Sequence, residues 1–200
     1  MVISNHIISG KTKFIAHIGF PTDTFTAPKI LNPCFKLLNI DLIVIPMACQ
    51  KGNLNNLIKG LTNLENFFGA LITMPHKQAI LSHLNFKSPL VEQSASCNIL
   101  KLNKSRETIG EIFDGIGVFK AICQKNVFPR NKSILLIGAG GVGFAIAFYL
   151  GAKGISKLAI FDLDVSRSTK LCSKIRHIFP KSEVDVWNSN CLLYTSDAAD

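Results

Sequence analysis

The strongest local signal in this chain is a glycine-rich turn between an apolar strand and an apolar helix. Gly138, Ala139, Gly140, Gly141, Val142 and Gly143 follow the apolar run 133–137 and precede the apolar stretch 144–150. In a G-x-G-x-x-G turn the first glycine permits a tight bend, the second lets the backbone approach a pyrophosphate, and the third lets the helix pack closely. The N–H groups that open the helix then point at the anion. The turn therefore predicts a dinucleotide-binding unit.

A carboxylate supports this prediction. A second strand-like run, 157–161, follows the helix, and Asp162 stands at its end. Dinucleotide-binding folds carry an acidic residue there, which hydrogen-bonds the adenosine ribose. The uncharged stretch 133–152 is long enough to cross a bilayer, but the glycines clustered in its middle favour a turn over a spanning helix.

The charge is spread out rather than concentrated. The 200 residues include 22 Lys+Arg against 13 Asp+Glu, a net charge of +9, and 48% of them are hydrophobic. The lysines are scattered, whereas a nucleic-acid site would gather arginines and aromatic residues. We therefore predict no nucleic-acid partner and no membrane partner, and a lysine-rich surface that attracts anionic ligands.

The cysteines indicate a reducing compartment. They form no C-x-x-C pair and lie mostly in apolar segments, at Cys34, Cys49, Cys97, Cys123, Cys172 and Cys191. This is typical of buried reduced thiols and not of a disulfide framework or a zinc site. No secretion signal opens the chain. The expected location is cytoplasmic, and no metal site is expected.

Apolar strands alternate with helical patterns along the chain, which predicts an α/β fold. Strands are expected at 14–20, 41–46, 69–74, 98–102, 108–113, 133–137, 157–161 and 184–187, and helices at 27–38, 54–64, 76–84, from 117 to about 125, and at 144–150. We predict one α/β domain over residues 1–114 and a Rossmann domain with a doubly wound parallel sheet over residues 115–190.

The segment 191–200 matches no element and resembles the translation of a sequencing adapter, so we expect a non-native tail there. About two and a half strand–helix units follow residue 133, fewer than a full doubly wound sheet needs. The Rossmann domain is therefore expected to be incomplete, and the natural protein to continue.

Polar groups end several strands of the first domain. Thr73 and Lys77 follow one strand, Asn98 opens the next hairpin, and Asp114 closes it. Taken singly, such a lysine is usually a solvated surface residue, the aspartate a turn or cap, the asparagine a hairpin cap and the threonine a packed strand residue. Their joint order favours a functional site.

This order of motifs, with Gly19 and Pro21 before it and the glycine turn after it, resembles the shikimate dehydrogenase family, including its quinate/shikimate and shikimate dehydrogenase-like branches. The resemblance covers residues 12–190. It implies that residues 1–114 bind the substrate and that the protein is an NAD(P)-dependent dehydrogenase. The implied reaction interconverts shikimate and 3-dehydroshikimate, quinate and 3-dehydroquinate, or a related small cyclic hydroxy acid and its ketone. The oligomeric state is left open.

The resemblance also implies residue roles. Lys77 matches the family's catalytic lysine and Asp114 its partner carboxylate, so the two would exchange protons with the ring hydroxyl and titrate as a pair. Thr73 and Asn98 match residues that hydrogen-bond the substrate's hydroxyls. His17 and His76, which flank these segments, are expected to be structural.

The chain departs from the family where the substrate carboxylate is usually held. A Ser-x-Ser pair is usual there, and the aligned residues are Phe25 and Ala27. An apolar site is a poor host for a carboxylate. We therefore expect a substrate less polar than shikimate, with Thr24 or Thr26 as replacement hydroxyls.

The residue after the second Rossmann strand predicts the cofactor. Family members that use NADP typically carry an asparagine-arginine-threonine segment there, whereas this chain has Asp162, Leu163 and Asp164. A carboxylate accepts hydrogen bonds from the ribose 2′-OH and repels a 2′-phosphate. NAD is therefore the preferred cofactor expected, and NADP the alternative, with Arg167 or Lys157 as its partner.

Two other functions remain as alternatives. A ligand-sensing homologue would bind nucleotide and metabolite without turnover, but retention of both Lys77 and Asp114 favours an enzyme. The other is a different dehydrogenase with a catalytic lysine, such as the methylenetetrahydrofolate type. The Thr73–Lys77 context favours the shikimate-like branch over it.

Overall fold

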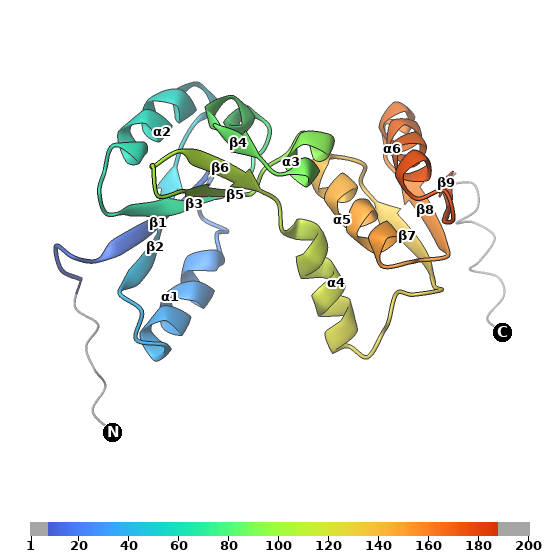
Figure 1. Ribbon diagram of the computed structural model, residues 1–200, viewed down its shortest axis with the longest axis horizontal. Helices are drawn as coiled ribbons and strands as arrows, with labels where there is room; N and C mark the ends of the chain where they lie inside the picture. The colour runs from blue at the N-terminus through green and yellow to red at the C-terminus, as the bar shows by residue number, and fades with distance from the viewer. Residues whose placement is uncertain (1–7, 188–200) are drawn as a thin grey trace. The chain divides into compact units, whose positions relative to one another are not determined.

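The computed structural model describes residues 8–187, which fall into two compact units divided between Ile112 and Phe113. The division precedes the boundary expected after residue 114, so Asp114 belongs to the second unit. Each unit has its own sheet, with six strands in the first and three in the second (Figure 1). The predicted tail, 191–200, lies outside the described residues.

The first unit is a mixed sheet with strand order β2-β1-β3-β5-β6-β4. Its strands are β1 (Lys13–Gly19), β2 (Leu42–Ala48), β3 (Phe67–Ile72), β4 (Phe86–Lys87), β5 (Ile99–Leu102) and β6 (Thr108–Glu111). β1 pairs in parallel with β2 and β3, while β5 is antiparallel to β3 and β6. The expected strands and the hairpin between β5 and β6 are confirmed. The carboxyl ends of β1, β2 and β3 meet at one edge, which is where α/β sheets bind ligands.

Two helices connect these parallel strands on opposite sides of the sheet (Figure 1). α1 (Ala27–Leu37) joins β1 to β2, and α2 (Leu54–Thr62), after the 3₁₀ turn η1 (Lys51–Asn53), joins β2 to β3. α2 buries an apolar stripe of Leu54, Ile58 and Leu61 at helical spacing. α1 buries none of its residues, and the Asn32 side chain joins it to both backbone groups of Val44 on β2, at 2.7 and 3.1 Å.

The helix predicted over 76–84 is wrong. After β3 the chain turns and forms only a 3₁₀ helix, η2 (Ala79–His83). The Ser82 hydroxyl donates to the Ala79 carbonyl at 3.0 Å, a local bond that competes with the helical pattern. Asn85 then pairs with Thr108 through backbone and side chain, which draws the chain into the sheet. Lys77 therefore lies in a turn, not at the start of a helix.

The second unit is a parallel sheet in the order β7-β8-β9, which is that of the first half of a Rossmann sheet. Its strands are β7 (Ser133–Ile137), β8 (Lys157–Phe161) and β9 (Glu183–Val186), and its helices α4 (Asp114–Gln124), α5 (Gly141–Ala152) and α6 (Val165–Ile178). The predicted strands and the α/β fold class are confirmed. The sequence pattern did not indicate α6, nor α3 (Pro89–Ser94) and β4 in the first unit.

Helix α4 begins earlier than predicted. It starts at Asp114 and not after Gly117, with the carboxylate of Asp114 in the first turn, where the helix dipole favours negative charge. Gly115 lies inside the helix, where α4 packs directly on α5. A Cβ at this position would collide with the Ala145 carbonyl oxygen. The close packing of α4 on α5 therefore requires a residue without a side chain at position 115.

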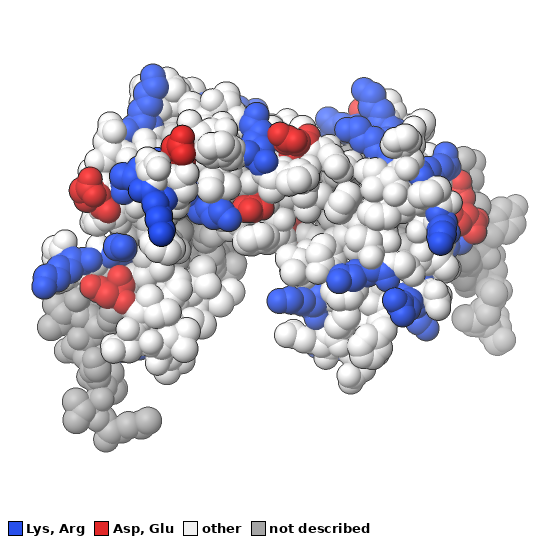
Figure 2. All heavy atoms as spheres, viewed as in Figure 1, with Lys and Arg blue, Asp and Glu red and all other residues white. Residues whose placement is uncertain are grey.

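On the face shown in Figure 2, Lys and Arg lie singly or in small groups, with Asp and Glu between them. Within residues 8–187 no helix is long and apolar enough to cross a membrane. The uncharged stretch 133–152 is divided into β7, the glycine turn and α5.

Candidate active site

The ends of β1 and β3 are tied together by backbone hydrogen bonds. The Thr73 N–H donates to the Ile18 carbonyl, and the Phe20 N–H donates to the Met74 carbonyl, both at 3.0 Å. Gly19 lies between these bonds, and a Cβ there would meet the Thr73 side chain and, at 2.7 Å, the Phe25 ring. Thr73 is therefore fixed where β1 and β3 end.

Lys77 and Asn98 are held beside the same strand end. The Ile72 N–H donates to the Asn98 carbonyl at 2.8 Å, and the Cys97 N–H donates to the Lys77 carbonyl at 2.9 Å. These bonds bring Asn98 to the same edge of the sheet as Thr73 and Lys77, although it is distant from them in sequence. Lys77 and Asn98 are both half-buried.

The turn that contains Lys77 is held in place by the preceding residue, His76. His76 is fully buried, and its Nε2 lies 2.6 Å from the Cys49 carbonyl at the end of β2. Cys49 in turn donates its N–H to the Gly19 carbonyl at 2.9 Å. His76 therefore links the ends of all three parallel strands, which agrees with the structural role expected for it.

Asp114 is the first residue of α4 and lies in the second unit. Its predicted partner, Lys77, lies in the first. The pairing of Lys77 with Asp114 therefore remains a prediction, because the two residues belong to different units.

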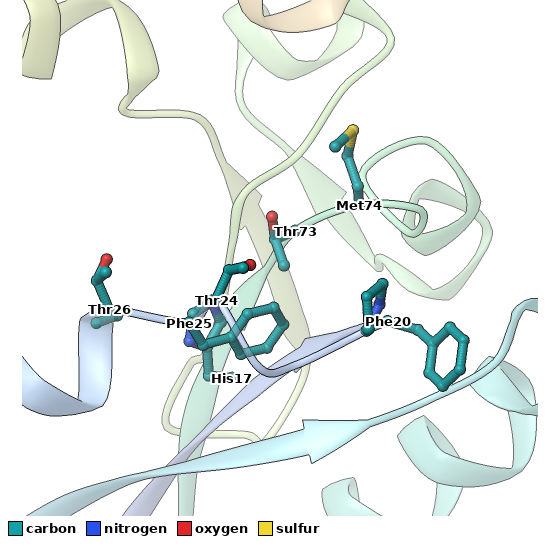
Figure 3. Close-up of a pocket in the computed structure, with 9 residues that line it drawn as sticks. His17, Phe20, Thr24, Phe25, Thr26, Thr73 and Met74 are labelled. Carbon is teal, nitrogen blue, oxygen red and sulfur yellow. The ribbon is translucent and has the colours of Figure 1, made fainter.

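A pocket of about 430 Å³ opens beside Thr73 (Figure 3). It is lined by the end of β1, the loop that follows and the turn after β3, through His17, Phe20, Pro21, Thr24, Phe25, Thr26, Ala27, Thr73 and Met74. Phe25 and Ala27, which replace the usual serines, both line it, as do both proposed replacement hydroxyls, Thr24 and Thr26. The structure thus places Thr73, a predicted substrate-binding residue, in the same pocket as Phe25 and Ala27.

Burial controls the titration of two groups in this unit. Burial lowers the pKa of His17, which favours its neutral form at pH 7. Burial also raises the pKa of the Cys97 thiol to about 11, so this thiol next to Asn98 is protonated and a poor nucleophile.

The glycine turn of the second unit has the expected local geometry. Gly138 has a φ of +105°, which favours glycine. A Cβ at Gly143 would collide with the Gly138 carbonyl, so this residue sets the close approach of α5 to the turn. A Cβ at Gly140 would meet no atom within 4 Å. The side of Gly140 is therefore open to a ligand, at the N-terminus of α5.

Asp162 faces this turn from the end of β8. Its carboxylate accepts the Ala139 N–H at 2.7 Å and the Asp164 N–H at 2.9 Å. These two hydrogen bonds lower the pKa of Asp162, which is therefore ionised at neutral pH. Arg167 lies nearby but pairs with Asp164, at 3.4 Å.

These residues fit a dinucleotide. The turn supplies a left-handed glycine, an open backbone at Gly140, and a helix N-terminus for the pyrophosphate, and Asp162 supplies an oriented carboxylate for a ribose. By contrast, no cluster of three or more His, Cys, Asp or Glu suited to a metal ion occurs among the described residues.

Part of the pocket lining was not predicted from the sequence. His17, Phe20 and Met74 line it, although His17 was expected to be structural and the other two were assigned no role. The alternation along β1 offered a signal, because His17 falls on the face opposite Ala16 and Ile18 and next to Gly19. On this face of β1, His17 contacts Phe25 in the loop that follows the strand.

Relatives of similar sequence are named shikimate dehydrogenase (NADP(+)). A family model for the shikimate dehydrogenase substrate binding domain matches residues 18–100. A shikimate dehydrogenase (NADP(+)) of Methanococcus maripaludis is 32% identical over 169 residues, which cover 84% of this chain and 59% of the relative. That of Alkaliphilus oremlandii is 26% identical over 188 residues, with 94% and 64% covered. The chain thus spans less than two thirds of the length of these two relatives.

Solved structures agree with this fold. A shikimate dehydrogenase in complex with NADP+ has a TM-score of 0.82 and 26% identity, with 90% of this chain and 63% of that chain covered. The quinate dehydrogenase of Corynebacterium glutamicum in complex with NAD has a TM-score of 0.80 and 25% identity, with 94% and 68% covered. The names of both relatives above specify NADP(+), so the relatives do not support the expected preference for NAD.

Proposed function

Because this chain belongs to the shikimate dehydrogenase family, we propose that it acts as an NAD(P)-dependent dehydrogenase on a ring alcohol of the shikimate and quinate class. The observation that carries this proposal is the set of backbone bonds from Ile72 to Asn98 and from Cys97 to Lys77. These bonds hold Lys77 and Asn98 at the carboxyl edge of the sheet where Thr73 also lies. The dinucleotide-type turn in the second unit supports it independently.

The chemistry assigns one task to each group. Oxidation of a secondary alcohol needs a base that removes the hydroxyl proton, and the neutral amine of Lys77 would accept it. Asp114 would orient the resulting ammonium, and the hydroxyl of Thr73 and the amide of Asn98 would hold neighbouring ring hydroxyls. When bound, the nicotinamide accepts the hydride that leaves the alcohol carbon. Gly138–Gly143 and Asp162 would bind the dinucleotide.

The direct test is a spectrophotometric assay of the protein with NAD+ or NADP+ and with shikimate or quinate. We expect the absorbance of the reduced nicotinamide to rise with at least one of the four pairs. Binding of dinucleotide without turnover of either alcohol, or of their 3-dehydro ketones in the reverse direction, would instead support a sensor.

We further propose that NAD is preferred over NADP. The support is local: the ionised Asp162 carboxylate next to the glycine turn would accept the ribose 2′-OH and repel a 2′-phosphate. Arg167, whose charge acts on Asp162, already pairs with Asp164. This is where the chain would differ from relatives whose names specify NADP(+).

The substitution Asp162→Asn removes the negative charge. The amide oxygen can still accept the Ala139 N–H, although the amide NH2 cannot replace the oxygen that accepts the Asp164 N–H. We therefore expect the ratio of kcat/KM for NAD+ to that for NADP+ to fall by about tenfold, mainly through better use of NADP+. Arg167→Ala is the paired variant and should leave the ratio unchanged. A wild-type protein that prefers NADP+, or a ratio that Arg167 controls, would contradict the proposal.

A further inference from the structure

The pocket beside Thr73 contains a histidine whose hydrogen bonding is incomplete. His17 is only 9% exposed, and its Nδ1 is buried with no hydrogen-bond partner among the residues that the structure describes. Buried polar atoms are normally paired, and an unpaired one costs stability. Because His17 also lines the pocket, its ring is a candidate to meet a ligand.

The surroundings of His17 favour one state of its ring. The Phe25 ring stacks on the imidazole, with centroids 3.9 Å apart and planes inclined by 25° (Figure 3). Burial lowers the pKa of His17, so the ring is neutral near pH 7. A neutral imidazole presents one N–H donor and one acceptor nitrogen. This pair complements a hydroxyl group, which both donates and accepts.

The other residues that line the pocket are also uncharged. Thr24, Thr26 and Thr73 contribute hydroxyls, Phe20 and Phe25 contribute aromatic surface, and none of the described residues that line the pocket is charged. Asp23 and Lys29, the nearest charges in sequence, are exposed and do not line it. The N-terminus of α1 also borders the pocket and favours an anion, but Pro28 removes one N–H from its first turn. The uncharged lining outweighs the weak attraction of this helix N-terminus for an anion, so the pocket favours an uncharged ligand.

We propose that this pocket binds an uncharged, hydroxylated part of the substrate in place of a carboxylate, and that His17 is the residue that determines this specificity. The inference rests on the proposed function for the ring alcohol itself, and extends it to the substrate class. It assigns a ligand-binding role to a residue that the sequence pattern suggested was structural. The preferred substrate is therefore a neutral polyhydroxylated ring compound.

The test compares two probes that differ in one charge, shikimate and its methyl ester. With wild-type protein, calorimetric titration should give about tenfold tighter binding of the ester, and the ester should shift the imidazole nitrogen signals of His17 in NMR spectra. Equal binding, tighter binding of shikimate, or His17 signals that do not respond would overturn the proposal.

Variants assign the effect to the ring nitrogens. His17→Phe keeps an aromatic ring against Phe25 but removes the nitrogens, so ester affinity should fall by about tenfold. His17→Asn keeps a donor and an acceptor and should retain most of the affinity. His83→Phe, which changes a half-buried histidine outside the pocket, should have no effect. Dinucleotide affinity should stay constant in all three.

The outcomes separate this inference from the proposed function. Turnover of shikimate that exceeds turnover of the ester, unchanged in His17→Phe, would overturn the pocket assignment and leave the dehydrogenase assignment intact. Binding of the ester that depends on His17, in a protein that turns over no ring alcohol with either nicotinamide, would support the pocket assignment and contradict the dehydrogenase.

Discussion

Replacement of Lys77 by alanine is expected to lower turnover by about 10²–10⁴-fold, because proton transfer by a positioned base contributes that much. Dinucleotide affinity should stay nearly unchanged, since Lys77 and the glycine turn belong to different units. Lys77→Arg keeps the positive charge but cannot act as a neutral base, so it should be as impaired as the alanine variant. Steady-state kinetics of the three proteins measure this effect.

Two further variants test this assignment. Asp114→Asn keeps the shape of the carboxylate and removes its charge, so it should also lower turnover. Lys36→Ala, an exposed lysine in the last turn of α1, should leave turnover unchanged. Wild-type rates in Lys77→Ala would remove Lys77 from the mechanism.

The second large effect is expected at Gly143. A methyl group added by Gly143→Ala would collide with the Gly138 carbonyl, which is backbone and cannot move without opening the turn. We expect a loss of about 2–3 kcal/mol in the free energy of unfolding, together with loss of dinucleotide binding. Urea denaturation and calorimetric titration with NAD+ and NADP+ measure the two quantities.

Gly140→Ala is the matched variant. A Cβ at Gly140 meets no atom within 4 Å, and its φ of −77° suits alanine. Stability should therefore change by less than about 1 kcal/mol, while dinucleotide affinity falls at least about tenfold, because the methyl group occupies the approach of the pyrophosphate. Gly117→Ala, on α4 with the same free space, should leave binding unchanged. Tight dinucleotide binding by Gly140→Ala would show that the ligand does not approach this turn.

Features set by local chemistry followed from the sequence. The glycine turn and the strands on either side of it were predicted because a left-handed glycine and an apolar run act within a few residues. Asp162 was predicted from its place at the end of the next strand. The β5–β6 hairpin followed from its polar turn for the same reason. The positions of Thr73 and Asn98 at strand ends were likewise predicted from the order of the motifs.

Features set by distant contacts did not follow. η2 replaced the expected helix because Asn85 pairs with Thr108 on β6. Gly115 lies inside α4, where the lack of a side chain allows close contact with α5. Ile137 is apolar yet 74% exposed, since burial depends on what covers a strand and not on its composition.

The same distinction holds for the site. The sequence determined which groups are available, namely a lysine, a threonine, an asparagine and a dinucleotide-type turn. Only the tertiary structure brought Lys77 next to Cys97 and Asn98, and stacked Phe25 on His17. Hydrogen bonds between strands and the stacking of rings from separate segments depend on distances in space, and residue order does not contain them.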